Sequence, residues 1–115
     1  MSNDARIVIH FKDLEIDEAV RNHIQTRCEH LAEEFPETES FEITVERSHH
    51  AVDCHGHVSG KQTRTAAHAS GLESARHASD AFLEKLEREL RTHHDKRIFS
   101  QRRKAQKHRH EPDEE

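Results

Sequence analysis

The chain has 115 residues, of which 31% are hydrophobic and 36% are charged. A chain of this length forms one domain with one small core. The formal net charge of −5 argues against nucleic-acid binding through overall charge alone. No apolar run approaches the roughly 18 residues of a membrane span, and no signal-peptide pattern opens the chain, so we expect a cytoplasmic protein with no membrane partner.

The charges are unevenly distributed along the chain. Residues 1–60 hold five basic and thirteen acidic residues, a net charge of −8. Residues 61–109 hold thirteen basic and six acidic residues, a net charge of +7. We interpret this second part as the one that meets a polyanion. The alternative is that the charges only keep its surface solvated.

The first elements are a strand and an amphipathic helix. Apolar residues alternate with other residues over Arg6–Phe11, which predicts a strand with one buried face. Asp17 is a good N-cap for the following helix, and Pro36 helps to end it. The apolar stripe of this helix has steps of three and four residues and consists of Val20, Ile24, Cys28, Leu31 and Phe35.

Three more strands are predicted, over Phe41–Glu46, Val52–Val58 and Lys61–Ala69. Gly56 interrupts the inward row of the middle one, which predicts a bulge or the close approach of a helix. Cys28 and Cys54 lie on apolar faces and lack metal-binding or redox spacing, so we expect buried free thiols.

The last helix is predicted to begin near residues 70–72 and to end near Arg97. Its apolar stripe consists of Ala75, Ala78 or Ser79, Phe82, Leu83, Leu86 and Leu90. No apolar periodicity continues past Ser100, so we expect one domain over residues 1–98 and a disordered, charged tail over residues 99–115.

The order strand, helix, three strands, helix predicts an α+β fold, β-α-β-β-β-α. Three successive strands pair as antiparallel neighbours most simply, which gives a four-stranded sheet with both helices packed on one face. The other face is left in water, as its Glu, His, Thr and Arg residues require. This arrangement is like that of double-stranded-RNA-binding domains.

Three stretches of the chain carry a resemblance to a known family. They are FKDLEIDEAVRNHI (Phe11–Ile24), VSGKQTRTAAHA (Val58–Ala69) and KLERELRTHHDK (Lys85–Lys96). With the element order, they resemble the ribosome hibernation promoting factor and ribosome-associated inhibitor family, the sigma-54 modulation proteins, in its short form. The segment Ser74–Asp80 departs from the family pattern, because Arg76 stands where Tyr is usual.

The resemblance implies a translation inhibitor of starved cells that binds the small ribosomal subunit, and the 70S ribosome, where messenger and transfer RNA pass. Lys and Arg would contact phosphates of folded RNA, with no cofactor and no small-molecule substrate. By matching position, the RNA-binding residues are Lys12, Arg21, Lys61, Lys85, Arg88, Arg91 and Lys96. By their charge alone we add Arg64, Arg76, Arg97, Arg102, Arg103 and Lys104.

Two of these cations have a competing interpretation. Arg88 and Arg91 follow Glu84 and Glu87 at a spacing of four, which favours ion pairs within the helix instead. If about six of the cations meet phosphates, affinity falls by on the order of a thousandfold between 50 and 200 mM salt.

The chain has 13 histidines, and one group of them offers a candidate metal site. The possible ligands are His49, His50, Asp53, His55 and His57. On a strand, Asp53, His55 and His57 share the outer face, whereas Cys54 points the other way. The simpler interpretation is exposed histidines without a metal, which would still gain charge as the pH falls.

No catalytic motif is present, so we expect that the protein is not an enzyme. Besides a ribosome-binding inhibitor, two alternatives are a metal- or pH-responsive protein that keeps the fold without the ribosome, and a general duplex-RNA-binding module.

Overall fold

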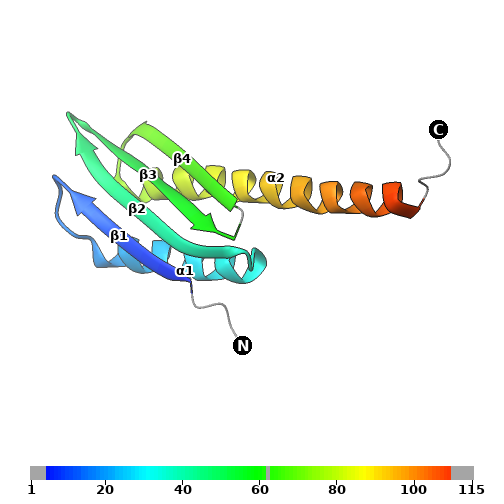
Figure 1. The fold of residues 1–115 in the computed structure, drawn as a ribbon. Helices are drawn as coiled ribbons and strands as arrows, with labels where there is room; N and C mark the ends of the chain where they lie inside the picture. The colour runs from blue at the N-terminus through cyan, green and yellow to red at the C-terminus, as the bar shows by residue number, and fades with distance from the viewer. Residues whose placement is uncertain (1–4, 62, 110–115) are drawn as a thin grey trace.

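Six elements follow one another in the predicted order in the computed structural model. They are β1 (Arg6–Lys12), α1 (Glu18–Glu34), β2 (Thr38–Ser48), β3 (Ala51–Gly60), β4 (Thr63–Leu72) and α2 (Ala75–Arg109) (Figure 1). The structure describes the backbone of residues 5–61 and 63–109, and the side chains of residues 5–61 and 63–96. None of the described helices has the length and apolar character that a membrane crossing requires.

The four strands form one sheet in the order β1-β2-β3-β4. β1 pairs in parallel with β2, because α1 carries the chain back before β2 begins. β2, β3 and β4 pair as antiparallel neighbours. This confirms the predicted α+β fold.

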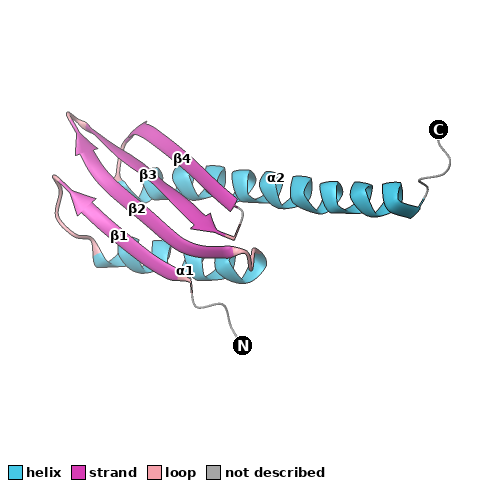
Figure 2. Cartoon of the chain, viewed as in Figure 1, coloured by secondary structure: helices cyan, strands magenta, loops and turns pink. Residues whose placement is uncertain are grey.

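Both helices pack on the same face of the sheet (Figure 2). Between the layers lies one core, in which Phe35, Phe41 and Phe82 are the largest fully buried side chains. The whole predicted stripe of α1 is buried, and so are Phe82, Leu83, Leu86 and Leu90 of α2. Burying these apolar groups is the main stabilising term for a domain of this size.

Asp17 caps α1 as predicted. Its Oδ1 accepts hydrogen bonds from the backbone N–H groups of Ala19, at 3.0 Å, and Val20, at 3.2 Å. These bonds satisfy two of the donors that a helix N-terminus leaves without partners. The cap fixes the direction of α1, so that its buried stripe faces the sheet.

The prediction for the start of α2 was wrong by several residues. The chain stays extended to Leu72, and the helix begins at Ala75. Asp53 on β3 accepts a hydrogen bond from the backbone N–H of Gly71 at 3.0 Å, and Gly71 has a φ of 76°. This long-range contact, at a register shift in the β3–β4 pair, keeps the chain on the sheet.

The far end of α2 also differs from the prediction. The helix continues to Arg109, past the predicted end near Arg97, and its last part projects beyond the sheet (Figure 1). Most of the expected tail, up to Arg109, is therefore helical, while residues 110–115 lie outside the described residues. The boundary of the domain at residue 98 stays a prediction.

Gly56 does mark a close approach, but to a strand and not to a helix. A Cβ atom at this position would overlap the backbone carbonyl oxygen of Glu42 and press on Ile43 of β2. Only glycine leaves room for the neighbouring strand here.

Candidate nucleic-acid interface

The cations of α2 fall on two flanks of the helix with different surroundings. Steps of three and eight residues place Lys85, Arg88 and Lys96 on one flank. This flank lies beside the edge strand β4, because the Lys85 amine donates a hydrogen bond to the backbone carbonyl of His68 at 2.9 Å. The opposite flank faces α1 and carries Arg76, Asp80, Glu87 and Arg91.

The β4 side collects a set of exposed cations that we call the basic flank. It comprises Lys61 in the β3–β4 turn, Arg64 on β4, and Lys85, Arg88 and Lys96 on α2. Within the described residues, none of the five forms an ion pair with a carboxylate. The competing interpretation of Arg88, pairing with Glu84, is therefore not what the structure shows.

Four other predicted cations are neutralised locally. The distances to their partners are 3.8 Å for Lys12 with Glu46, 3.5 Å for Arg21 with Glu18, and 3.4 Å for Arg76 with Asp80. Arg91 is bridged by Glu34 and Glu87, each at 2.8 Å, and its guanidinium lies over the Phe35 ring. The hydrogen bonds that Arg91 donates to Glu34 and Glu87 raise the pKa of Arg91. The intrahelical pairing expected for Arg91 is thus present.

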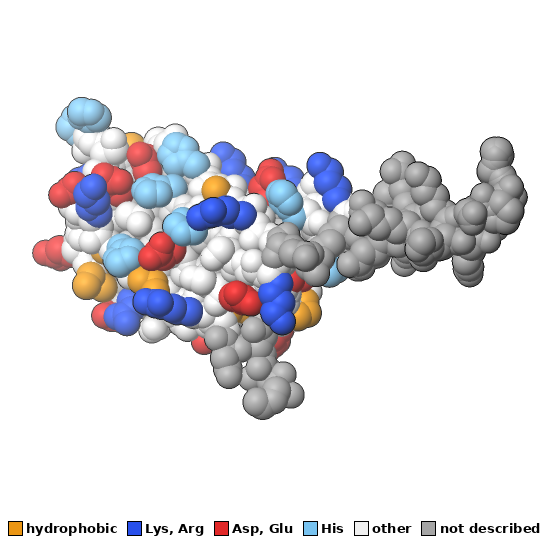
Figure 3. Space-filling model, viewed as in Figure 1, with side chains coloured by type: hydrophobic (Ala, Val, Ile, Leu, Met, Phe, Trp, Pro, Cys, Tyr) orange, Lys and Arg blue, Asp and Glu red, His pale blue; other side chains and the backbone are white. Residues whose placement is uncertain are grey.

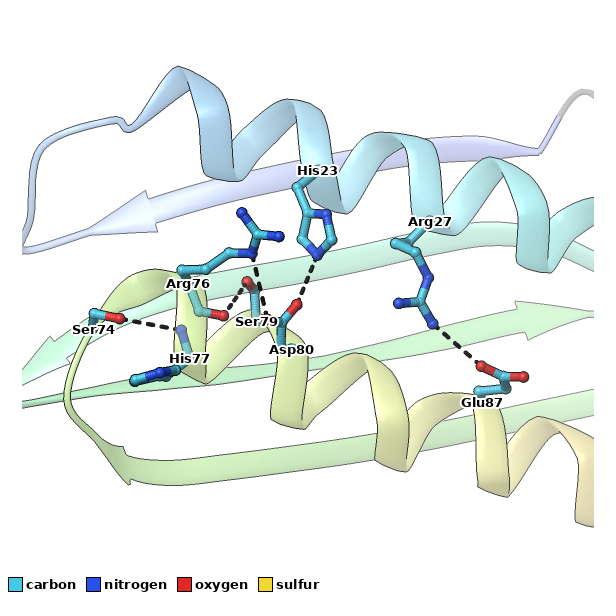
Figure 4. Close-up of polar contacts among 8 residues, drawn as sticks. All are labelled: His23, Arg27, Ser74, Arg76, His77, Ser79, Asp80 and Glu87. Atoms are coloured by element: carbon cyan, nitrogen blue, oxygen red, sulfur yellow. Dashed lines mark hydrogen bonds and ion pairs between the residues drawn. The ribbon is translucent and has the colours of Figure 1, made fainter.

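The α1-facing flank joins the two helices through polar contacts (Figure 4). His23 Nε2 lies 2.7 Å from Asp80 Oδ1, and Arg27 donates to Glu87 at 3.2 Å. Burial by itself raises the pKa of Asp80, but its hydrogen bond with His23 and the charges of His23 and Arg76 outweigh this and hold it below the usual range. The segment that departs from the family pattern therefore serves helix packing.

Ser74 precedes these contacts between the helices in sequence, and it caps α2. Its Oγ accepts a hydrogen bond from the backbone N–H of His77 at 3.2 Å. Figure 4 shows Arg76 in the first turn of α2, on the side that faces α1 and away from β4. Arg76 thus lies apart from the basic flank.

Several histidines lie on the solvent-facing side of the sheet (Figure 3). The strand register places His10, Thr44, His55 and His68 side by side across all four strands. His55 Nε2 lies 3.6 Å from a Glu46 carboxylate oxygen.

The side chains proposed as metal ligands do not converge. Asp53 bonds to the backbone of Gly71, and His57 Nε2 lies 3.2 Å from Glu42 Oε1. His49 and His50 form the β2–β3 turn at the end of the hairpin. Among the described residues, no group of three or more His, Cys, Asp or Glu side chains is placed to hold a metal ion.

Four predicted cations, Arg97, Arg102, Arg103 and Lys104, have side chains outside the described part of the chain. Two exposed cations that form no ion pair in the described part of the chain, Arg6 and Arg47, were not among the predicted ones. Arg6 is exposed on the open sheet face in the same row as Arg64, about 14 Å away across three strand spacings. The alternation of β1 put Arg6 on that face, but only the register places it opposite Arg64.

The two cysteines are buried free thiols, as predicted. Burial raises the pKa of Cys28 and of Cys54 to about 12. Because the thiolate is the reactive form, neither thiol is poised for chemistry at neutral pH. They belong to the core and not to a site.

The fold and this surface define a class: a small α+β domain that places five exposed cations without ion pairs, among the described residues, along the β4 edge of the sheet and the adjoining helix. A family model described as Sigma 54 modulation protein / S30EA ribosomal protein matches residues 7–98. The chain therefore belongs to this family of ribosome-associated proteins. No curated protein sequence matches it.

Two solved structures share the fold. One is a ribosomal subunit interface protein from Coxiella burnetii, with a TM-score of 0.66 and 16% identity, covering 78% of this chain and 98% of that one. The other is the N-terminal domain of Thermus thermophilus Protein Y, with a TM-score of 0.64 and 15% identity, covering 74% and 94%. At these identities the likeness shows the fold alone.

Proposed function

We propose that the protein is a cytoplasmic ribosome hibernation factor. It binds the small ribosomal subunit, alone or within the 70S ribosome, at the path of messenger and transfer RNA, and it stops translation in starved or stationary-phase cells. Family membership supports the ribosome as partner, as does the name of the Coxiella burnetii structure, a ribosomal subunit interface protein. The observation that carries the RNA contact is the basic flank.

The basic flank suits folded RNA for a physical reason. Its side chains are exposed and lack carboxylate partners among the described residues, so their charge is available to phosphates. They come from a turn, a strand edge and a helix, so they follow the shape of a backbone and do not read base edges. Five phosphate contacts give a salt dependence on the order of a hundredfold to a thousandfold between 50 and 200 mM salt.

The test compares two variants that lose the same charge. Arg64→Gln with Arg88→Gln removes two free cations, whereas Lys12→Gln with Arg21→Gln removes two cations that are already paired. Affinity for purified small subunits is measured between 50 and 200 mM salt, and sucrose-gradient sedimentation follows the protein in stationary-phase lysate. We expect the first variant to lower the salt slope by about two and to leave the ribosome fractions.

The control variant is expected to keep both its slope and its place in the gradient. Equal losses in the two variants would show that total charge matters and that the basic flank is not the contact surface. Wild-type protein that stays at the top of the gradient would remove the ribosome as partner.

The projecting part of α2 should add to binding. Residues 100–109 include Arg102, Arg103 and Lys104, and a rod of this charge attracts phosphate. Deleting residues 100–115 is expected to weaken binding and to lower the salt slope. An unchanged slope would show that this block does not touch RNA.

A further inference from the structure

A hollow of about 500 Å³ lies at the end of the domain opposite the projecting part of α2. Residues of the β1–α1 loop, the end of β2, the start of β3 and the segment from Glu73 to Ala75 line it. Figure 1 shows these segments together at the end of the domain opposite the projecting part of α2. Its apolar walls are Leu14, Val52 and Ala75, and its charged lining residues include Glu15, Arg47 and Glu73.

The loop that lines the hollow also carries an exposed apolar side chain. Ile16, between the lining residues Glu15 and Asp17, is 61% exposed and is the one large hydrophobic residue that is exposed among the described residues. The neighbouring Asp17 holds the loop in place through its cap on α1. An exposed aliphatic group in the loop that lines a partly apolar hollow is typical of a binding surface.

The rim of the hollow is acidic. Glu15 lines the hollow and Asp13 lies two residues earlier in the same loop; both are exposed and form no ion pair within the described part of the chain. The Glu73 side chain is 90% exposed and, among the described residues, forms an ion pair only with His77, at 3.8 Å. Arg47 is the one basic residue that lines the hollow. RNA would be repelled from such a rim, whereas a cationic polypeptide would be attracted.

The geometry points to a docking site for a short Lys- and Arg-rich polypeptide segment of another protein, whose one apolar side chain enters the hollow beside Ile16 while its cations meet Asp13, Glu15 and Glu73. We infer a basic occupant because the exposed carboxylates around the hollow attract positively charged side chains. The site is separate from the basic flank and does not depend on it. The domain therefore has a second surface, apart from the basic flank, that suits a basic protein partner.

The probe is the capped peptide KRLRK, titrated into the ¹⁵N-labelled full chain and followed by NMR. We expect chemical-shift changes concentrated at residues 13–17, 47 and 73–75. The peptide KRSRK, which lacks the apolar residue, should bind at least about fivefold more weakly, as expected for one buried aliphatic side chain. The acidic peptide EDLDE should produce no shifts there.

Variants of the chain separate the apolar and the charged contributions. Ile16→Ser is expected to weaken KRLRK binding about fivefold, and because Ile16 is exposed the fold should be retained. Glu15→Lys with Glu73→Lys should weaken it at least tenfold. Glu33→Lys with Glu84→Lys makes the same charge change on the outer faces of α1 and α2, away from the hollow, and should change binding less than about twofold.

Three outcomes would overturn the inference. Shifts spread over all acidic surfaces, or equal losses in the two Lys variants, would indicate unspecific charge attraction. Absence of binding would show that the hollow takes no basic peptide. Shifts of the same residues on raising the protein concentration alone would show that a second copy occupies the hollow. None of these results bears on RNA binding, which is measured separately.

Discussion

His23 on α1 and Asp80 on α2 approach each other to 2.7 Å, although they are separated by 57 positions in sequence. Arg76, one turn earlier on α2, approaches the same carboxylate at 3.4 Å. The contact between His23 and Asp80 makes the α1–α2 packing dependent on the ionised form of Asp80.

Replacing Asp80 by Asn is expected to lower the free energy of unfolding at pH 6 by about 0.5–1 kcal/mol, a small value because the Asp80 side chain is 44% exposed and the pair is screened by water. The pKa of Asp80 is lower in the folded protein than in the unfolded chain. Its contribution is therefore present above the unfolded pKa, near 3.9, and is lost as the pH falls through the folded pKa.

Urea unfolding at pH 6 and pH 3 checks this prediction, with Glu84→Gln as a control at an exposed carboxyl group of α2. The difference between wild type and Asp80→Asn should shrink at pH 3. A difference that is the same at both pH values would mean that Asp80 acts through packing and not through its charge.

Gly56→Ala is expected to destabilise the sheet strongly. The new methyl group would overlap the carbonyl oxygen of Glu42, and backbone atoms of a central strand cannot move aside cheaply. A loss of about 1–3 kcal/mol is the usual cost of such overpacking. Thermal or urea unfolding measures it.

Gly71→Ala is the matched control, because nothing lies within 4 Å of the added atom and only its φ of 76° is unfavourable. Its cost should be about 1 kcal/mol, from backbone strain alone. A smaller loss for Gly56→Ala than for Gly71→Ala would contradict the close approach of β2.

Thr65 is buried on the inner face of β4, and its hydroxyl oxygen has no hydrogen-bond partner in the described part of the chain. Thr65→Val keeps the shape and removes the unsatisfied group, so the free energy of unfolding should rise by about 1 kcal/mol. Calorimetry or urea unfolding would detect this. A fall in stability would show that the hydroxyl has a partner, such as a water molecule.

The apolar periodicity predicted most of the fold, because burial follows local sequence steps. The stripe that contains Ile24 and Leu31 is buried as expected, and Asp17 caps its helix. The start of α2 was not predictable in this way. It depends on the hydrogen bond from Gly71 to Asp53, which lies 18 residues earlier and is set by strand register.

The sequence predicted which cations could belong to the candidate site, but it did not predict which of them lie together on one surface without an ion pair. Sequence steps of four predicted the Glu87–Arg91 pair, but Glu34 and Phe35, which also hold Arg91, come from the other helix. The partner of Arg27 is 60 positions away. Which cations remain available to RNA is decided by such contacts between distant segments.

The histidines of the open sheet face predict a pH dependence of ribosome binding. His55 and His68 face each other with ring centroids 6.2 Å apart, and His10 lies in the same row. The carboxylates of Glu42 and Glu46 lie beside His57 and His55, and imidazole is the side-chain type that commonly changes charge in the physiological pH range.

Affinity for the small subunit at constant salt is therefore expected to rise several-fold from pH 7.5 to pH 6. Replacing His55 and His68 by Gln should flatten this profile, because the glutamine side chain carries no charge at either pH. His30→Gln, on the outer surface of α1, should leave it unchanged. A wild-type affinity that is flat across this range would show that RNA binding does not involve the open sheet face.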